Sequence, residues 1–282
     1  MNNVHIIDKV LKQSEEHYVL NLSDIHIDSK NFDRELLKKH LDMAIERNAT
    51  VFINGDLLDV MGAKRDPRSL PNDIRPEYNK AGASYLDLVV EDCFQFLKKY
   101  NDLDFFISYG NHETNIIKRQ QFDPLKLLAH YINYSGGNVT LGAYTGALIF
   151  RYIRGKSSEK RLVKWFYHHG SGGGAQRSKG ILNADILVAQ NSWADVITSG
   201  HDHNKWHFPF TAKHLSPFKL EWNKRKVEIL RTGSYKKKSL DFGWEVEKNF
   251  NEPTLGGWWV KNKWENTGNK ERIIKTTIEE AN

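Results

Sequence analysis

The sequence predicts a layered α/β fold, in which helices pack against β-sheets, and three observations support this prediction. In the first half of the 282-residue chain, short apolar runs typical of buried strands alternate with segments of helical periodicity. The second half is rich in strand-like segments, with one convincing helix among them. Hydrophobic residues make up 39% and charged residues 27% of the chain, which is a globular balance. Short strands that alternate with helices favour a layered α/β domain.

Hydrophobic periodicity and β-branched content assign the elements of the first half of the chain. Helices are expected at residues 3–13, 32–47, 83–99 and 124–134. Asp33 stands at the start of the second of these helices and Pro124 in the first turn of the last. Strands are expected at residues 18–22, 50–53 and 104–108. The polar segment 61–82 contains three prolines and is predicted to be a long loop, which in compact domains is often functional.

Strands dominate the second half of the chain. They are expected at residues 148–153, 161–167, 195–198, 227–230 and 258–260. No internal repeat, low-complexity tract or long Pro/Ser linker divides the sequence. We therefore expect residues 1–282 to form a single domain. Its motif-bearing core would lie at about residues 17–205, and a strand-rich C-terminal part, 206–282, would complete the second sheet.

Composition limits the compartment and the class of protein. No apolar run approaches the roughly 20 residues that span a bilayer, and residues 1–10 lack the pattern of a secretory signal. Cys93 is the single cysteine, so no internal disulfide can form, and its apolar-periodic surroundings predict a small core residue. We expect a cytoplasmic location and no membrane partner. The formal charge of +6 permits an anionic partner without requiring one.

Residue types that bind metals follow five of the predicted strands. These strand ends read Asp24-Ile25-His26, Gly55-Asp56-Leu57-Leu58-Asp59, Gly110-Asn111-His112-Glu113, His168-His169-Gly170 and Gly200-His201-Asp202-His203. Each cluster alone is weak, because a Gly-Asp pair is usually a turn and a lone buried His is usually a core residue. Together they hold six of the 12 histidines and supply imidazole and carboxylate without thiolate. Five such clusters at strand ends indicate a metal or catalytic site.

This ordered set resembles the signature of the calcineurin-like metallophosphoesterases. That signature reads Asp-x-His, Gly-Asp-x-x-Asp, Gly-Asn-His-Glu/Asp, a His before Gly or Pro, and Gly-His-x-His, and all five motifs are present between Asp24 and His203. The resemblance implies a sandwich of two mixed β-sheets flanked by helices. It also implies two divalent metal ions at the C-terminal strand ends, with manganese expected first and zinc, iron or magnesium as alternatives.

The resemblance further implies a role for each residue of the motifs. The metal ligands would be Asp24, His26 and His203 for the first ion, Asn111, His169 and His201 for the second, and Asp56 for both. His168 is the alternative to His169, which we favour because it directly precedes Gly170. Asp59, Glu113 and His168 would orient neighbouring ligands rather than bind metal. His112 is the candidate general acid for the leaving oxygen.

The spacing of these residues suits hydrolysis at phosphorus. Ligands two residues apart, as in 24–26 and 201–203, would lie on one side of the chain if the backbone is extended. Two cations about 3.5–4 Å apart can clamp both oxygens of an in-line displacement. A carboxylate shared at Asp56 would let the like charges approach each other. A water between the two metals, acidified by both, would then attack as a metal-bridging hydroxide.

The sequence departs from two known branches of the family, which reduces the number of candidate substrate classes. Val60-Met61-Gly62 follow Asp59, where phosphoprotein phosphatases carry Arg-Gly, and His112 stands where lipid A pathway hydrolases place Arg. We therefore expect a phosphodiesterase or nuclease whose substrate is a phosphodiester in DNA, RNA or a nucleotide. The alternatives are a phosphomonoesterase or protein phosphatase, and a catalytically silent nucleic-acid-binding scaffold.

Three segments are candidates for substrate contact, although the oligomeric state is not predicted. The loop 61–82 and the Gly-rich stretch 170–174 leave directly from the motifs. Of the cations in and beside them, the expected substrate contacts are Arg65, Arg68, Arg75, Arg177 and Lys179. The alternative for both is a merely solvated loop. Tryptophans interleaved with Lys and Arg in the C-terminal third could stack single-stranded nucleic acid. For these tryptophans we favour a role in a second-sheet core or a dimer interface.

Overall fold

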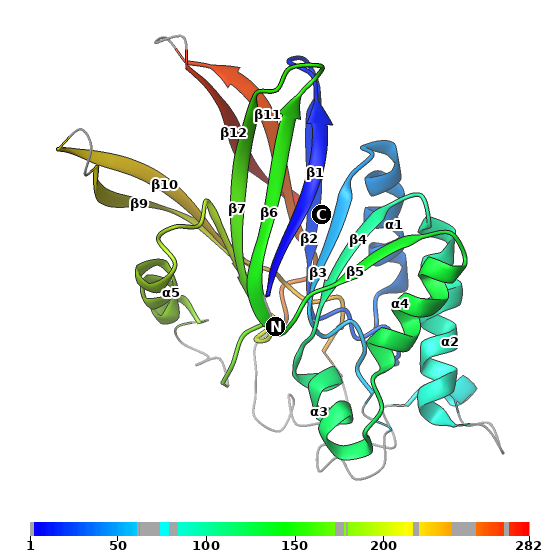
Figure 1. Cartoon of the computed structure of the whole chain (residues 1–282). Helices are drawn as coiled ribbons and strands as arrows, with labels where there is room; N and C mark the ends of the chain where they lie inside the picture. The colour runs from blue at the N-terminus through cyan, green and yellow to red at the C-terminus, as the bar shows by residue number, and fades with distance from the viewer. Residues whose placement is uncertain are drawn as a thin grey trace.

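Two six-stranded β-sheets pack against each other in the computed structural model, with helices on their outer faces (Figure 1). The structure describes residues 3–60, 62, 74–78, 84–172, 178, 180–216, 220–238, 252–267 and 271–281. The predicted class, a layered α/β sandwich of two mixed sheets flanked by helices, is confirmed by this arrangement. Among the described residues, every helix is too short or too polar to cross a bilayer.

The first sheet has the strand order β12-β11-β2-β3-β4-β5. Four of its strands run parallel: β2 (Glu16–Leu22), β3 (Thr50–Asn54), β4 (Asp104–Ser108) and β5 (Asn138–Leu141). β11 (Gly257–Asn266) and β12 (Arg272–Ala281) extend the sheet with antiparallel pairing. β3 is buried along its whole length, as expected for a parallel strand that is covered on both faces.

Three helices cover the outer face of the first sheet: α1 (Arg34–Glu46), α2 (Tyr85–Leu97) and α4 (Pro124–Tyr134). Helix and strand side chains share one core, which includes Leu41, Val90, Leu128, Val51 and Ile107. Cys93 is fully buried in this core, as predicted. Asp33 caps α1, since its carboxylate accepts a hydrogen bond from Leu36 N at 3.1 Å. Short 3₁₀ turns lie at η2 (Pro76–Tyr78), η3 (Lys98–Tyr100) and η4 (Ile181–Asn183).

The second sheet has the strand order β1-β6-β7-β8-β10-β9. Its members are β1 (Val4–Leu11), β6 (Thr145–Arg154), β7 (Lys160–His168), β8 (Val196–Ser199), β9 (Trp206–Ser216) and β10 (Glu221–Arg231). β7, β8 and β10 are parallel to one another, whereas β6 and β9 run antiparallel to their partners β7 and β10. The short helix α5 (Ala184–Gln190) packs on β8, β9 and β10 around a smaller apolar cluster.

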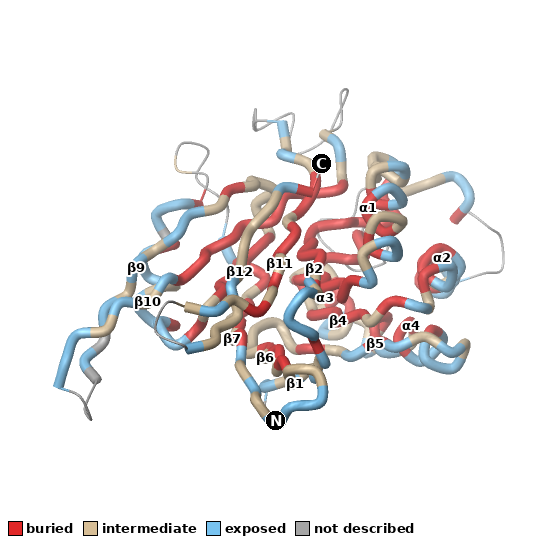
Figure 2. Tube along the Cα trace, turned by 90° about the horizontal axis from the view of Figure 1, so that it is seen from above, coloured by how far each residue is buried: buried red, intermediate tan, exposed pale blue. Residues whose placement is uncertain are grey.

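Aromatic side chains fill the space between the two sheets. Phe52 and Phe106 of the first sheet meet Trp165 and Tyr167 of the second, with ring centroids 5.5–5.8 Å apart in edge-on contacts. Viewed from above, the buried residues concentrate along the strands of both sheets and beneath the helices (Figure 2). These rigid layers hold the loops at the C-terminal ends of the strands in fixed positions.

The N-terminal segment corrects one prediction. Residues 3–13 were expected to form a helix, but Val4–Leu11 form strand β1, which pairs in parallel with β6. Exposure alternates along the strand with a period of two, so that His5 packs edge-on against Phe106 while Val4 and Ile6 face outward. β-branched residues favour a strand, and pairing with β6, more than 130 residues away, outweighs the weak helical periodicity.

Several elements were not predicted, and the C-terminal strands are distributed between the two sheets differently from the prediction. The sequence reasoning did not find β5, β9, β12 or the helix α3 (Asn111–Gln120), which starts inside the third motif. The C-terminal part was expected to complete the second sheet, but it adds β9 and β10 to one sheet and β11 and β12 to the other. Trp206, Trp259 and Trp264 are buried, whereas Trp222 is exposed. Most of the predicted loop 61–82 lies outside the described residues.

Candidate metal centre

The five motifs meet at one edge of the sandwich because of the direction of the strands. β2, β3 and β4 are parallel neighbours, so the loops that follow them leave from the same edge of the first sheet. β7 and β8 are parallel neighbours in the facing sheet. Gly200 N donates a hydrogen bond to His169 O at 2.7 Å, and Asp24 N donates to Gly55 O at 3.1 Å, which ties neighbouring motifs together. The arrangement gathers carboxylate, amide and imidazole groups at the C-terminal strand ends.

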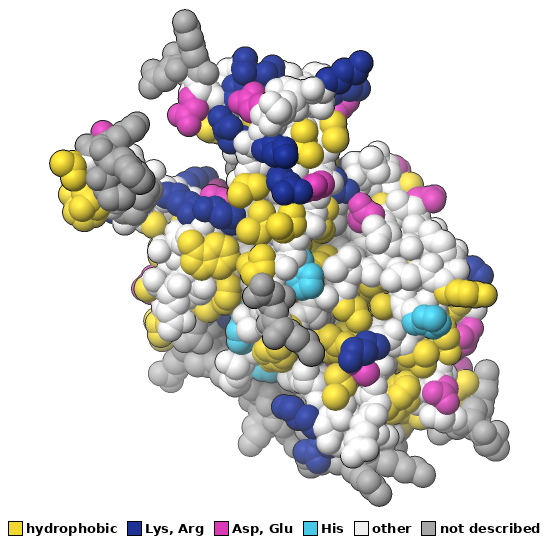
Figure 3. Space-filling view, viewed as in Figure 1, with side chains coloured by type: hydrophobic (Ala, Val, Ile, Leu, Met, Phe, Trp, Pro, Cys, Tyr) yellow, Lys and Arg dark blue, Asp and Glu magenta, His cyan; other side chains and the backbone are white. Residues whose placement is uncertain are grey.

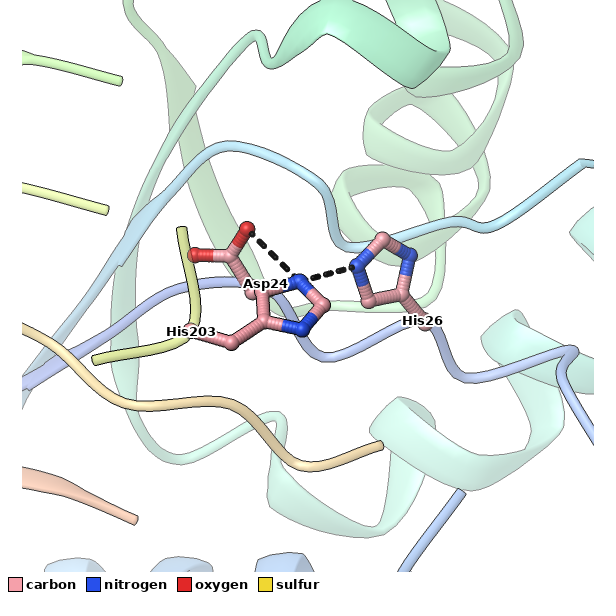
Figure 4. A group of neighbouring side chains, drawn as sticks. All are labelled: Asp24, His26 and His203. Atoms are coloured by element: carbon pink, nitrogen blue, oxygen red, sulfur yellow. Dashed lines mark hydrogen bonds and ion pairs between the residues drawn. The ribbon is translucent and has the colours of Figure 1, made fainter. Parts of the chain in front are cut away.

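One group of donors joins Asp24, His26 and His203 (Figure 4). The two imidazole Nε2 atoms lie 3.3 Å apart, and His203 Nε2 lies 3.5 Å from Asp24 Oδ1. Asp24 is fully buried, and its Oδ1 accepts no hydrogen bond from any described residue, while Oδ2 accepts from Ser23 and from His201 N. A buried carboxylate oxygen without a donor is costly. A cation between these three side chains would satisfy it.

A second group joins Asp56, Asn111, His169 and His201. His169 Nε2 lies 3.1 Å from Asp56 Oδ2 and 3.2 Å from Asn111 Oδ1, and His201 Nδ1 lies 2.8 Å from the same Asn111 oxygen. The other ring nitrogen of His169, Nδ1, lies 2.8 Å from the backbone oxygen of Asn54 and donates to it. This bond orients the ring so that Nε2 faces the group, as is usual for a metal-binding imidazole.

The backbone at this edge is held in the left-handed region. Five of the seven expected ligands have positive φ: Asp24 at 50°, His26 at 50°, Asp56 at 51°, His201 at 80° and His203 at 56°. The condition of an extended backbone, under which a spacing of two residues would put both side chains on one side, is therefore not met at these positions. Such residues cost about 1–3 kcal/mol each and cluster at functional sites. A Cβ at Gly110 would collide with the Asp56 carboxylate, so only glycine fits there.

Burial and charge set opposite protonation preferences within the two groups. Burial disfavours ionisation of Asp56, but the neighbouring His169 and His112 outweigh it and hold the pKa of Asp56 well below its usual range. Burial also lowers the pKa of His26, to about 4, despite the nearby Asp59 carboxylate. In His169 the attraction of Asp56 overcomes burial and raises the pKa to about 10. Ionised carboxylates beside neutral imidazoles are ligands for divalent cations, which would displace the His169 proton on binding.

His112 lies beside these groups without joining either of them. Its Nδ1 lies 2.5 Å from the backbone oxygen of Asp59 and donates to it. Its Nε2 is 3.9 Å from Asp56 Oδ2, on the side of the donors. Asp59 also holds His26, whose Nδ1 is 2.9 Å from Asp59 Oδ1. The carboxylate of Asp59 thus orients one expected ligand, and its carbonyl orients the expected acid.

Glu113 connects the loops that follow β3 and β4. It is fully buried, and its carboxylate accepts hydrogen bonds from the backbone N–H groups of Asp56 (3.2 Å), Leu58 (3.0 Å) and Gly110 (2.9 Å). Burial and the nearby Asp56 charge raise the pKa of Glu113 to about 7. The side chain therefore holds the Asp56 turn against the start of α3 and does not enter the metal-binding groups.

The remaining predicted residues lie apart from the donors. His168 Nδ1 accepts a hydrogen bond from Gly170 N at 2.9 Å, and its ring packs edge-on against Tyr144. Asp202 turns away from the donors to form a buried ion pair with Arg231. Arg75 was expected to contact substrate, but it binds the backbone oxygens of Ser29 and Ile27 and the Asp92 carboxylate. We therefore withdraw Arg75 as a substrate contact. Arg65, Arg68, Arg177 and Lys179 lie outside the described residues.

Two cations near the site were missed by the sequence reasoning. Lys236 Nζ lies 3.3 Å from Asp59 Oδ2, and with the neighbouring His26 it overcomes burial to hold the pKa of Asp59 well below its usual range. Arg231 donates to Ser199 Oγ at 3.2 Å and lies over the Trp206 ring. Both residues follow the last motif, in a part of the chain where no sequence signal singled them out.

The paired histidines supply a first test of the geometry. We expect His169→Ala to lose about one equivalent of bound metal, because its Nε2 faces Asp56 and Asn111. His168→Ala should keep its metal and lose mainly stability, since it removes a bond to Gly170 and a ring contact with Tyr144. Elemental analysis after loading, together with thermal unfolding, checks both variants. If His168→Ala lost metal and His169→Ala did not, His168 would be the ligand in place of His169.

One family model matches this chain, and several solved structures are similar to it. The family model described as calcineurin-like phosphoesterase matches residues 17–205. No curated protein matches the sequence. Among solved structures, Plasmodium GAP50, described as the anchor in the inner membrane complex, is similar at 13% identity with a TM-score of 0.42, covering 95% of this chain and 85% of that chain. Chaetomium thermophilum Vps29 is similar at 9% identity with a TM-score of 0.36, covering 94% and 97%. A predicted phosphoesterase of Streptococcus pneumoniae is similar at 14% identity with a TM-score of 0.30, covering 94% and 98%.

Proposed function

The chain belongs to the calcineurin-like phosphoesterase family, which implies a metal-dependent phosphoesterase, and we propose that it hydrolyses a phosphodiester in a nucleic acid or nucleotide. The observation that carries this proposal is the position of His112. One ring nitrogen is bound to Asp59 O, and the other lies on the side of the metal-binding groups, 3.9 Å from Asp56 Oδ2. A sugar alkoxide is a poor leaving group and needs a proton as the ester bond breaks. We propose that His112 supplies this proton.

The ligands are proposed to divide between two divalent ions. Asp24, His26 and His203 would hold one ion, Asn111, His169 and His201 would hold the other, and Asp56 would contribute to both. Oxygen and nitrogen donors without thiolate suit manganese, zinc, iron or magnesium, and we propose manganese as the first metal to test. When bound, such ions polarise the phosphoryl oxygens and lower the pKa of water.

In this proposal, the protein's own side chains orient the expected metal ligands and protonate the leaving oxygen. Asp59 holds His26 through its carboxylate and His112 through its carbonyl, so movement of Asp59 would disturb a ligand and the acid together. Lys236 keeps Asp59 ionised by a contact of 3.3 Å. Glu113 fixes the Asp56 turn through three backbone hydrogen bonds. The leaving oxygen would receive its proton from His112 Nε2, because Nδ1 is already bound to a backbone carbonyl.

Diester preference is tested with a substrate panel in the presence of manganese. The panel contains aryl phosphomonoesters, aryl phosphodiesters, cyclic nucleotides, and single- and double-stranded DNA. We expect kcat/KM for an aryl diester to exceed that for the matching monoester by roughly tenfold or more, which corresponds to about 1.4 kcal/mol. A preference for the monoester would support a phosphomonoesterase instead.

A catalytically silent scaffold is the competing function. Two groups of donors with a carboxylate oxygen left without a hydrogen bond, as at Asp24, argue against a vestigial site. Such a scaffold would bind nucleic acid and show no metal-dependent turnover of any ester in the panel. Turnover that disappears with a chelator and returns with added metal would exclude it.

A further inference from the structure

The hairpin formed by β9 and β10 extends beyond the sandwich (Figure 1). Its base is anchored, since Val227 and Ile229 pack with α5 and Leu230 packs in the core between the two sheets. Burial falls away toward the tip, where Trp222 is 70% exposed and Leu215 is 52% exposed. The outer half of the hairpin therefore presents side chains that the rest of the described fold does not cover.

One face of this outer half combines an aromatic ring with lysines. Cross-strand pairing sets Trp222 opposite Leu215, Lys224 opposite Lys213 and Lys226 opposite Thr211. Alternation along a strand puts all six side chains on the same face. We call this face the hairpin platform. Figure 3 shows hydrophobic side chains at the tip of the projecting hairpin and Lys and Arg side chains closer to the body.

The charge on the hairpin platform is not balanced locally. Lys213 and Lys224 stand directly opposite each other, and like charges in that arrangement destabilise a sheet. Neither lysine forms an ion pair with a described residue, whereas Lys226 pairs with Glu228 at 2.5 Å. None of the six platform residues is acidic. An anion that bridges Lys213 and Lys224 would relieve their repulsion.

We propose that the hairpin platform binds single-stranded nucleic acid, with a base stacked on Trp222 and phosphates on Lys213 and Lys224. This inference rests on the proposed nucleic-acid substrate and adds a second contact point for it. A polyanion matches lysines without acidic neighbours, and an exposed indole can stack on a base only when that base is unpaired and free. Duplex DNA keeps its bases inside the helix, so the platform favours single strands.

The platform lies far from the metal centre along a single strand. β10 (Glu221–Arg231) holds Trp222 near one end and Arg231 at the other, and the Arg231 guanidinium binds Asp202 between His201 and His203. Nine residues of strand span roughly 30 Å at about 3.3 Å each. A nucleic acid strand with stacked bases covers that distance in roughly nine nucleotides at about 3.4 Å each, and in fewer when extended. Long strands would engage both places, while dinucleotides and aryl diesters would reach only the metal centre.

Binding of a fluorescently labelled single strand about 20 nucleotides long, longer than this span, tests the platform. Anisotropy is measured with metal removed by a chelator, so that no cleavage occurs. We expect Trp222→Ala to weaken binding by roughly 5- to 150-fold, the range for one base stacked on an aromatic ring. Trp222→Phe should keep most of the affinity. Each of Lys213→Ala and Lys224→Ala should reduce the slope of log affinity against log salt by roughly 0.7.

Matched surface changes provide the control. Tyr134 on α4 is 88% exposed and Lys99 in η3 is also exposed, so Tyr134→Ala and Lys99→Ala remove an exposed aromatic ring and an exposed lysine away from the hairpin. Equal effects of Trp222→Ala and Tyr134→Ala would overturn the proposal. So would preferential binding to duplex DNA, or binding to anionic lipid vesicles but not to the single strand. Because Trp222 and both lysines are exposed, the variants should unfold at the wild-type temperature.

Experiments can contradict the proposed binding at the hairpin platform and the proposed phosphodiesterase activity independently of each other. All platform variants should turn over a small aryl diester at the wild-type rate, because that substrate does not reach the hairpin. Diester turnover without single-strand binding would overturn the platform alone. Trp222-dependent binding without turnover of any diester would support the platform and contradict the proposed phosphodiesterase.

Discussion

Asp56→Asn should bring metal-dependent turnover down to background and reduce the amount of bound metal. The Asp56 carboxylate lies 3.1 Å from His169 and is held ionised within a fully buried pocket. An amide has nearly the same shape but no charge, so two cations at this site would repel each other without compensation. Metals supply several kcal/mol of transition-state stabilisation, which corresponds to roughly 10³-fold or more in rate. Steady-state kinetics and elemental analysis measure the two effects.

A buried carboxylate away from the metal-binding groups gives the control for Asp56→Asn. Glu228 is buried on β10 and pairs with His207 at 2.7 Å and with Lys226. Glu228→Gln also removes a buried charge, but it should keep the wild-type metal content and rate. If Asp56→Asn retained two metal ions and near-normal turnover, Asp56 could not serve both ions.

The expected ligands were identifiable from the sequence because their placement follows from local rules. Each stands one to four residues beyond the last residue of a strand, and parallel strands deliver such residues to a common edge. The limits of α1 and α4 were also predictable, since Asp33 caps one helix and Pro124 begins the other. Hydrophobic periodicity, capping residues and proline act over a few residues, and a sequence displays them directly.

What the sequence did not give depends on contacts between distant parts of the chain. Strand β1 exists because β6 offers it a parallel partner, and nothing within residues 4–11 specifies that pairing. Lys236 reaches Asp59 from 177 residues away. Arg75 lies in a cationic segment that suggested phosphate binding, but its guanidinium donates hydrogen bonds to the backbone oxygens of Ser29 and Ile27. Which cations face a site and which hold the fold together is decided by tertiary packing.

The backbone conformation of the ligands was a further gap. A spacing of two residues puts both ligands on one side if the chain is extended, but Asp24 and His26 both have φ of 50°. Non-glycine residues adopt this region rarely and at a cost. The cost is offset by neighbouring bonds, such as those of Ile25 N and His26 N to Asp56 O at 2.8 and 3.1 Å. Sequence periodicity carries no information about such turns, because they are imposed by the loops packed around them.

His112→Ala should keep both metal ions and lose turnover by roughly 10²–10⁴-fold, the usual contribution of general acid–base catalysis. The side chain belongs to neither group proposed to hold a metal, and its Nε2 is 3.9 Å from the Asp56 carboxylate. The loss should be large for a diester with an alkyl or sugar leaving group. It should be small for a nitrophenyl diester, whose leaving oxygen needs no proton. Rates for a series of leaving groups, with metal content measured on the same samples, test this expectation.

Two results would contradict the assignment of His112 as the acid. Loss of a metal ion in His112→Ala would make His112 a ligand, for instance with His26 and Asp59, whose ligand atoms lie within 4.8 Å of one another and of His112. An equal loss of rate for every leaving group would mean that His112 stabilises charge on the phosphoryl group and transfers no proton. His130→Ala, which removes an exposed imidazole on α4, is the matched control and should leave metal content and rates unchanged. A steeper dependence of rate on leaving-group pKa in His112→Ala than in the wild type is the outcome that general acid catalysis requires.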